Sequence, residues 1–200
     1  MHFKTFLSVF PHAIAWMPVA NEILIIGSDH PIEIDFEKLK GRFLDPAVNR
    51  VMQEIQVPDA FSFLSNIWFL EDQMNSLAGH QKEITDNWPF IEFYLNLGNV
   101  LGIYEREDFL FTRTPFKNIV DRISNITYNE QKRLKATFDG MNLYQRGVTY
   151  SNREMLLESL SQLEGSDLVR YHLQASSKQV STLMQEVKSN PSDLEALLNL

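Results

Sequence analysis

The stretch FPHAIAWMPVANEILIIGSDHP, residues 10–31, decides the kind of fold that the rest of the chain can have. It contains two apolar runs, residues 13–18 and 22–28, separated by three residues, which is the pattern of two antiparallel strands. The second run, EILIIGS, is almost continuously apolar. We therefore expect it to be buried on both faces, with helices on both sides of its sheet.

A sheet of only two strands is marginally stable in water, so we expect these runs to be the end of a larger sheet. If this interpretation is correct, we expect the sequence to be the later part of a longer protein. It also predicts an unpaired edge along residues 13–18. Because unpaired strand edges recruit further strands, we expect homo-oligomerisation through this edge.

The composition indicates a globular chain and excludes several classes of protein. Of its 200 residues, 44% are hydrophobic, and 18 basic against 26 acidic side chains give a net charge of −8, which argues against nucleic acid as a partner. The chain has no cysteine, which excludes disulfides and a cysteine nucleophile and favours a cytoplasmic location. It has no apolar run of the roughly 18 residues that a membrane-spanning helix needs, so no membrane contact is expected.

Three helices are expected after the strands, and each begins at an aspartate that can cap it. Asp35 precedes residues 36–45, Asp45 precedes a segment that opens with Pro46, and Asp59 precedes an apolar segment that ends at Gly79. The pattern predicts a single helix over residues 59–79, because apolar residues recur there at helical spacing. Its expected core residues are Phe61, Leu64, Trp68, and Met74 or Leu77.

The next segment contains several boundaries. Pro89 favours an extended stretch or strand over residues 90–94. Residues 105–128 are predicted to be a linker, in which Pro115 marks a boundary and residues 116–126 form a short helix.

Residues 129–200 are expected to be wholly helical, and the window 133–166 has about the 34-residue length of a tetratricopeptide repeat. The apolar positions on its two helices are Leu134, Phe138, Leu143 and Tyr144, then Leu156, Leu160 and Leu163. The segment NPSDLEALLNL at 190–200 resembles the start of a further repeat. The predicted organisation is an α/β part at 1–104, a linker at 105–128 and a mostly α part at 129–200.

No signature of autonomous catalysis is present, since the chain has no phosphate-binding glycine loop, nucleophile elbow or paired histidine motif. Its five histidines are scattered, so no metal site is expected. The segment TDNWPFIEF at 85–93 leaves two interpretations open. Either Asp86 holds a turn while the aromatic residues pack, or Asp86 and Glu92 face a cleft and attract a cationic amine.

Two stretches together resemble a known family. The pattern FPHAIAWMP, EILIIGSDHPIEID, DPAVNRVM and then TDNWPFIEF is similar to the C-terminal part of spermidine synthase-like proteins, over roughly residues 3–95. The resemblance implies a methyltransferase-like, Rossmann-like sheet, with the two apolar runs as its last strands and residues 3–10 as the end of the preceding helix. In the family phrase T-D-D, Thr85 and Asp86 match and Asn87 departs from it.

The resemblance implies aminopropyl transfer from decarboxylated S-adenosylmethionine to an amine. The family's nucleotide-binding turn and catalytic aspartate lie upstream of the matching region, so we expect no catalysis and no bound cofactor for this chain alone. Where the family has a substrate-facing tyrosine, this chain reads WMPVANE. There Trp16 either offers an aromatic wall to a cationic amine or packs in the core.

A second hypothesis is a non-catalytic module whose tetratricopeptide-like helices bind a protein partner on a concave surface. It fits residues 129–200 and leaves the apolar strands unexplained. A third is a degenerate remnant without activity. The expected partners are therefore a polyamine, another protein or a second copy of the chain.

Overall fold

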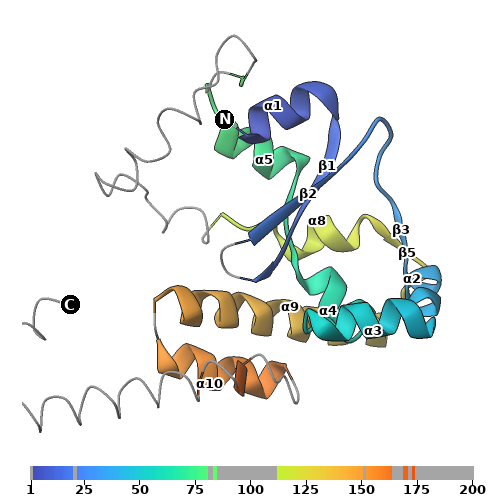
Figure 1. Cartoon of the computed structure of the whole chain (residues 1–200), viewed down its shortest axis with the longest axis vertical. Coiled ribbons are helices and arrows are strands. Elements are labelled where there is room, and N and C mark those ends of the chain that lie inside the picture. Colours follow the sequence, from blue (N-terminus) through green and yellow to red (C-terminus); the bar gives the residue numbers. More distant parts are fainter. Residues whose placement is uncertain are drawn as a thin grey trace, which may run out of the picture.

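The computed structural model describes residues 2–19, 22–80, 83–84, 112–150, 152–163, 169–170 and 173. These residues form a mixed α/β structure around a small antiparallel sheet (Figure 1). The expected strand at 90–94 and the expected site residues Asp86 and Glu92 lie outside the described residues.

The predicted strand pair is confirmed as β1 (His12–Val19) and β2 (Glu22–Ser28). The two strands are antiparallel, with Ile14 opposite Ile26 and Trp16 opposite Leu24. A third strand, β4 (Ile67–Leu70), pairs with the other side of β1, so the order is β2-β1-β4. The predicted free edge at residues 13–18 is therefore wrong, because β1 is the central strand.

Alternating residues of β1 build two separate cores. Ala13, Ala15 and Met17 face α1 (His2–Val9) and α5 (Glu71–Ala78), where two alanines let the helices approach the sheet closely. Ile14 and Trp16 face the opposite way and belong to a larger core. Figure 1 shows α1 and α5 together on one side of the hairpin and α9 with α10 on the other.

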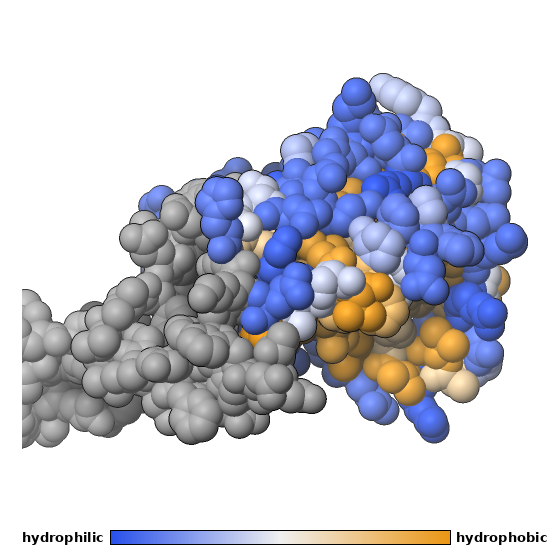
Figure 2. Space-filling view, turned by 90° about the horizontal axis from the view of Figure 1, so that it is seen from above, coloured by the Kyte–Doolittle hydropathy of each residue, from blue (hydrophilic) through white to orange (hydrophobic). Residues whose placement is uncertain are grey.

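The expectation that β2 is buried on both faces is wrong. Leu24 is 56% exposed and Ile26 is 47% exposed, whereas Ile23 and Ile25 are partly buried against the core on the α1 side. One face of β2 is thus covered by helices and the other reaches the surface. In the view of the molecule in Figure 2, hydrophobic side chains gather into a patch among hydrophilic ones.

The single helix predicted over residues 59–79 is also wrong. The segment forms α4 (Ala60–Ser65), then β4, then α5. Its ends are as predicted, with Asp59 accepting a hydrogen bond from the backbone N–H of Ser62 and Gly79 ending α5 at a φ of 51°. The middle is a strand because the β-branched and aromatic run IWFL pairs with β1, a long-range contact that helical periodicity does not reveal.

As a result, the predicted core residues of this segment are buried but divided between two cores. Phe61 and Leu64 belong to the core that contains Trp16, and Trp68 and Met74 belong to the core on the α1 side.

Helix starts were predicted correctly at Asp35 and Asp45. Asp35 caps α2 (Phe36–Phe43) by accepting from the N–H of Lys38, and Asp45 caps α3 (Pro46–Glu54) by accepting from the N–H of Ala47. Asp35 also ends the short strand β3 (Ile34–Asp35), which pairs in parallel with β5 (Ile123–Ser124).

The described part of the predicted linker packs into the fold. α8 (Phe116–Val120) is shorter than the predicted helix over 116–126, because the chain turns at its end and enters β5. Ile119 and Ile123 are buried in the same core as Trp16. The reason is again a distant partner, since Ile123 lies opposite Ile34.

The predicted helical hairpin is present as α9 (Tyr128–Thr149) and α10 (Arg153–Gln162). Glycines allow the two helices to approach closely, since a Cβ atom added at Gly147 would lie 2.9 Å from Cγ of Leu156. Leu134 and Phe138 of α9 lie in the same core as Trp16, so α9 packs against the α/β part. Whether the hairpin is of tetratricopeptide type stays a prediction. None of the described helices is long and apolar enough to cross a membrane.

Candidate functional site

Trp16 is the one expected site residue that the structure describes, and it lies inside the core. It is 4% exposed, its ring lies 5.2 Å from that of Phe63 between centroids, and its Nε1 donates to the carbonyl oxygen of Phe63 at 2.8 Å. The indole N–H is thus hydrogen-bonded and the indole ring is packed against another ring within the protein. This placement fits the packing interpretation and leaves no open ring face for an amine.

Ile84, the described residue before the segment that contains Asp86, lies close to α1. Its backbone N–H donates to Oγ1 of Thr5 at 2.7 Å. Trp16 lies in the core on the other side of the sheet from α1.

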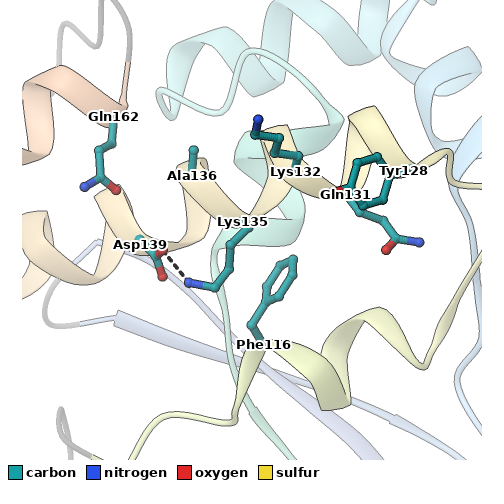
Figure 3. Close-up of a pocket in the computed structure, with 8 residues that line it drawn as sticks. All are labelled: Phe116, Tyr128, Gln131, Lys132, Lys135, Ala136, Asp139 and Gln162. Carbon is teal, nitrogen blue, oxygen red and sulfur yellow. Dashed lines mark hydrogen bonds and ion pairs between the residues drawn. The ribbon is translucent and has the colours of Figure 1, made fainter.

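The described residues form an open groove of about 430 Å³ on the exposed side of α9. Figure 3 shows that its walls come from three elements, with Phe116 on α8, a row of side chains on α9, and Gln162 on α10. The α9 residues in that row are Tyr128, Gln131, Lys132, Lys135, Ala136 and Asp139. They recur at intervals of three and four, which places them on one helix face.

The groove combines aromatic surface with positive charge. Nζ of Lys135 lies 5.7 Å from the ring centroid of Phe116 and forms an ion pair with Asp139 one turn along the helix. Tyr128 is 80% exposed. Among the residues that the structure describes, Lys132 has no ion-pair partner.

A second polar arrangement, around Arg113, anchors the fold. Its guanidinium lies between the rings of Trp68 and Phe138, 4.1 Å and 3.4 Å from their centroids. It donates to the carbonyl oxygens of Phe138 at 3.0 Å and Ile67 at 3.1 Å, and also to that of Ser65. Burial lowers the pKa of Arg113, and the negative charge of Asp139 opposes part of that shift. Arg113 therefore joins α9 to β4 and is a structural group.

A third group joins β1, α5 and the turn after α8. Oε1 of Glu71 lies 2.5 Å from Nη2 of Arg122 and 3.4 Å from Nδ1 of His12. Burial raises the pKa of Glu71, but hydrogen bonds from its own backbone and from Arg122 outweigh it and lower the pKa overall. Because Arg122 and His12 both contact the carboxylate of Glu71, the group links three parts of the fold and has a structural role. No cluster that could hold a metal ion occurs in the described part of the chain.

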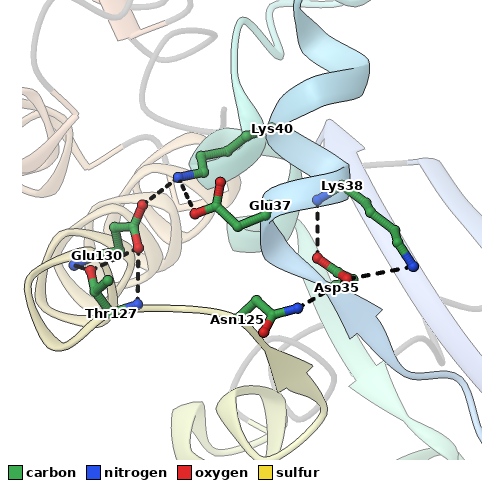
Figure 4. A network of polar contacts seen from close by, with 7 residues as sticks. All are labelled: Asp35, Glu37, Lys38, Lys40, Asn125, Thr127 and Glu130. Carbon is green, nitrogen blue, oxygen red and sulfur yellow. Dashed lines mark hydrogen bonds and ion pairs between the residues drawn. The ribbon is translucent and has the colours of Figure 1, made fainter.

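One ion pair ties α2 to the start of α9, and a second lies within α2 (Figure 4). Nζ of Lys40 lies 2.6 Å from Glu130 and 2.7 Å from Glu37. Glu130 also accepts from the N–H of Thr127 at 2.9 Å, closing a capping box. The hydrogen bond from Lys40, followed by those from Thr127, lowers the pKa of Glu130 to about 2.

Comparisons of the chain with protein-family models, curated proteins and solved structures gave no match. The candidate site is therefore judged on geometry alone. The groove was not predicted from the sequence, because its walls come from three separate elements. The signal that could have suggested it is the helical spacing of Tyr128, Lys132, Lys135 and Asp139.

Proposed function

We propose that this chain is the C-terminal portion of a spermidine synthase-like protein, and that it completes the sheet and borders the amine site of that protein. The observation that carries the proposal is the position of β2. Among the described residues β2 pairs only with β1, and the apolar side chains of Leu24 and Ile26 remain exposed.

An edge strand of this kind is suited to receive another strand. Its outer backbone groups would be hydrogen-bonded if the sheet continued beyond β2, and elements packed on that larger sheet would cover its exposed apolar side chains. The order helix, strand, antiparallel strand, here α1, β1 and β2, is what the resemblance implies for the end of a methyltransferase-like sheet, whereas the later strand β4 on the other side of β1 departs from it. The continuation of the sheet would carry the nucleotide-binding and catalytic groups.

The reaction in the complete protein would be a displacement at carbon. The amine nitrogen attacks the propyl carbon next to the sulfonium, the carbon–sulfur bond breaks, methylthioadenosine leaves, and a carboxylate outside this chain takes the amine proton. Asp86 and Glu92 would hold the cationic amine by charge. The proposal gives Trp16 no contact with the amine, because Trp16 is buried in the core.

The first test is the intact mass of the gene product in its own cell, followed by an aminopropyl transfer assay on that product. We expect a mass above the 23.2 kDa of this chain and formation of methylthioadenosine from decarboxylated S-adenosylmethionine and putrescine. A product of 23.2 kDa that binds neither methylthioadenosine nor putrescine would overturn the proposal.

A matched pair of variants then tests the carboxylates. Asp86→Asn should raise the KM for the amine while leaving that for the nucleotide unchanged, because it removes charge from the amine side only. Asp108→Asn, a similar change within the acidic run EREDF at 105–109, is the control and should have no effect. Equal effects of the two variants would contradict the assignment of Asp86.

A separate protein-interaction module at residues 129–200 is the alternative. The packing of Leu134 and Phe138 into the core of Trp16 argues against an independent module, because α9 would lose part of its buried face without the α/β part. The groove on α9 favours a binding role for this helix within the whole structure.

A further inference from the structure

We infer that the groove on α9 binds an acidic amphipathic segment of a partner protein. The groove runs along one exposed helix face and is wide open to solvent (Figure 3). A small ligand needs most of its surface enclosed, which an open groove does not provide. A peptide segment instead binds by lying along such a groove and inserting a few side chains.

Two aromatic residues of the groove, Phe116 beside Lys135 and Tyr128 at one end, provide the apolar contacts (Figure 3). Phe116 is partly buried and packs on Phe138 at 5.4 Å between ring centroids, so its position is fixed by the core. Tyr128 is 80% exposed at the start of α9. Ala136 on the same helix face adds only a methyl group to the groove lining. Aromatic anchors on a rigid base are typical of the residues that dominate binding energy at interfaces.

The charge of the groove selects an acidic partner. Its lining contains two lysines and one aspartate, a net charge of +1, whereas the whole chain carries −8. Lys132 is exposed and has no ion-pair partner in the described part of the chain. Lys135 is paired with Asp139 on the same helix, and exposed pairs of this kind are weak, so Lys135 can exchange Asp139 for a carboxylate of the partner.

The same features disfavour other occupants. A nucleic acid would be repelled by a chain whose net charge is −8. A second copy of this chain would bring the same net charge of −8 and would have to present one of its acidic surfaces. An acidic segment with leucine or phenylalanine at helical spacing matches both the lysines and the aromatic walls.

The test uses the full chain and a fluorescein-labelled peptide in which Glu-Glu-Leu-Phe is repeated three times. We expect saturable binding by fluorescence anisotropy that weakens as salt rises, because exposed charge pairs are screened. Chemical shift changes should concentrate at Gln131, Ala136 and Gln162, which line the groove. A peptide with lysine in place of glutamate should not bind.

Matched variants locate the binding. Lys132→Glu combined with Lys135→Glu should weaken peptide binding about tenfold or more, since it reverses both attractive charges. Arg50→Glu reverses one positive charge on α3, which does not line the groove, and should have no effect. Circular dichroism will show whether each variant is folded.

Four results would overturn the inference. They are equal binding to the double lysine variant and to wild type, equal binding of the lysine peptide, tighter binding of a single-stranded oligonucleotide, or self-association through the groove. None of them bears on aminopropyl transfer, so this inference and the proposed function can fail independently.

Discussion

β1 and β2 are adjacent, similarly apolar strands with opposite environments. In β1 the residues from Ala13 to Met17 are all buried, with exposed fractions between 0% and 6%, although two of them are alanines. In β2 the larger Leu24 and Ile26 are about half exposed. Composition alone would rank β2 as the more deeply buried strand. The comparison shows that the position of a strand in the sheet decides how deeply its side chains are buried. The central strand β1 has a strand on each side, whereas the edge strand β2 has one among the described residues.

The largest expected effect is at the centre of β1. Trp16→Ala should lower the free energy of unfolding by about 3–5 kcal/mol, because it opens a cavity beside Phe63 and removes the hydrogen bond to its carbonyl. Urea unfolding followed by far-ultraviolet circular dichroism measures the loss. Trp16→Phe, which keeps an aromatic ring, should lose less. A cost below about 1 kcal/mol for Trp16→Ala would mean that the central strand is no better packed than the edge.

The second effect tests the buried face of β2. A Cβ atom at Gly27 would lie 2.6 Å from Cγ of Phe10 and 2.7 Å from Cε1 of Phe6, so Gly27→Ala should destabilise by about 1–3 kcal/mol through overpacking. Gly41→Ala on α2 is the control, since no atom lies within 4 Å of the added group. It should stabilise by about 0.5–1 kcal/mol through helix propensity. Thermal unfolding of both variants gives the comparison, and a stabilising Gly27→Ala would show that α1 packs loosely on β2.

The third prediction concerns the exposed face and edge of β2. Leu24→Lys with Ile26→Lys should change stability by no more than about 0.5 kcal/mol per site, because surface substitutions cost little. The same variant should reduce self-association of the isolated chain, since lysines protect sheet edges. Sedimentation at increasing concentration measures this. Undiminished association would move the interface away from β2.

The smallest expected effect lies outside both strands and measures how much a surface ion pair contributes to the stability of the fold. The pKa of Glu130 is lowered to about 2 from an ordinary value of 4.5, so its ion pair stabilises the fold fully above pH 4.5. This stabilisation should be lost as the pH falls from 4.5 towards 2. Glu130→Gln should flatten the stability curve in that window, measured by urea unfolding at several pH values. Glu37→Gln is the control, and it should flatten the curve less because Glu37 does not cap α9.

Local signals in the sequence predicted part of the fold correctly. The caps at Asp35, Asp45 and Asp59 and the end of α5 at Gly79 follow from hydrogen bonds within one turn, so a short window contains all the information. The strand pair follows from its own periodicity and its short connection. The helical hairpin at residues 128–162 is equally local.

The candidate site was predictable only in part. Trp16 was identified as an aromatic residue of the strand pair, but its burial depends on Phe63 of α4, which is distant in the sequence. Asp86 and Glu92 remain predictions outside the described residues. The groove could not be predicted because α8, α9 and α10 must first be packed together.

The sequence by itself determined where α2, α3 and α4 begin, where the apolar hairpin lies and which catalytic signatures are missing, since each depends on neighbouring residues. Only the tertiary structure decided that residues 67–70 form a strand and that β1 is central. The tertiary structure also decided that Leu24 and Ile26 lie at the surface. The physical reason is that strand pairing and burial depend on partners tens of residues away, whose contribution outweighs the local preference for a helix.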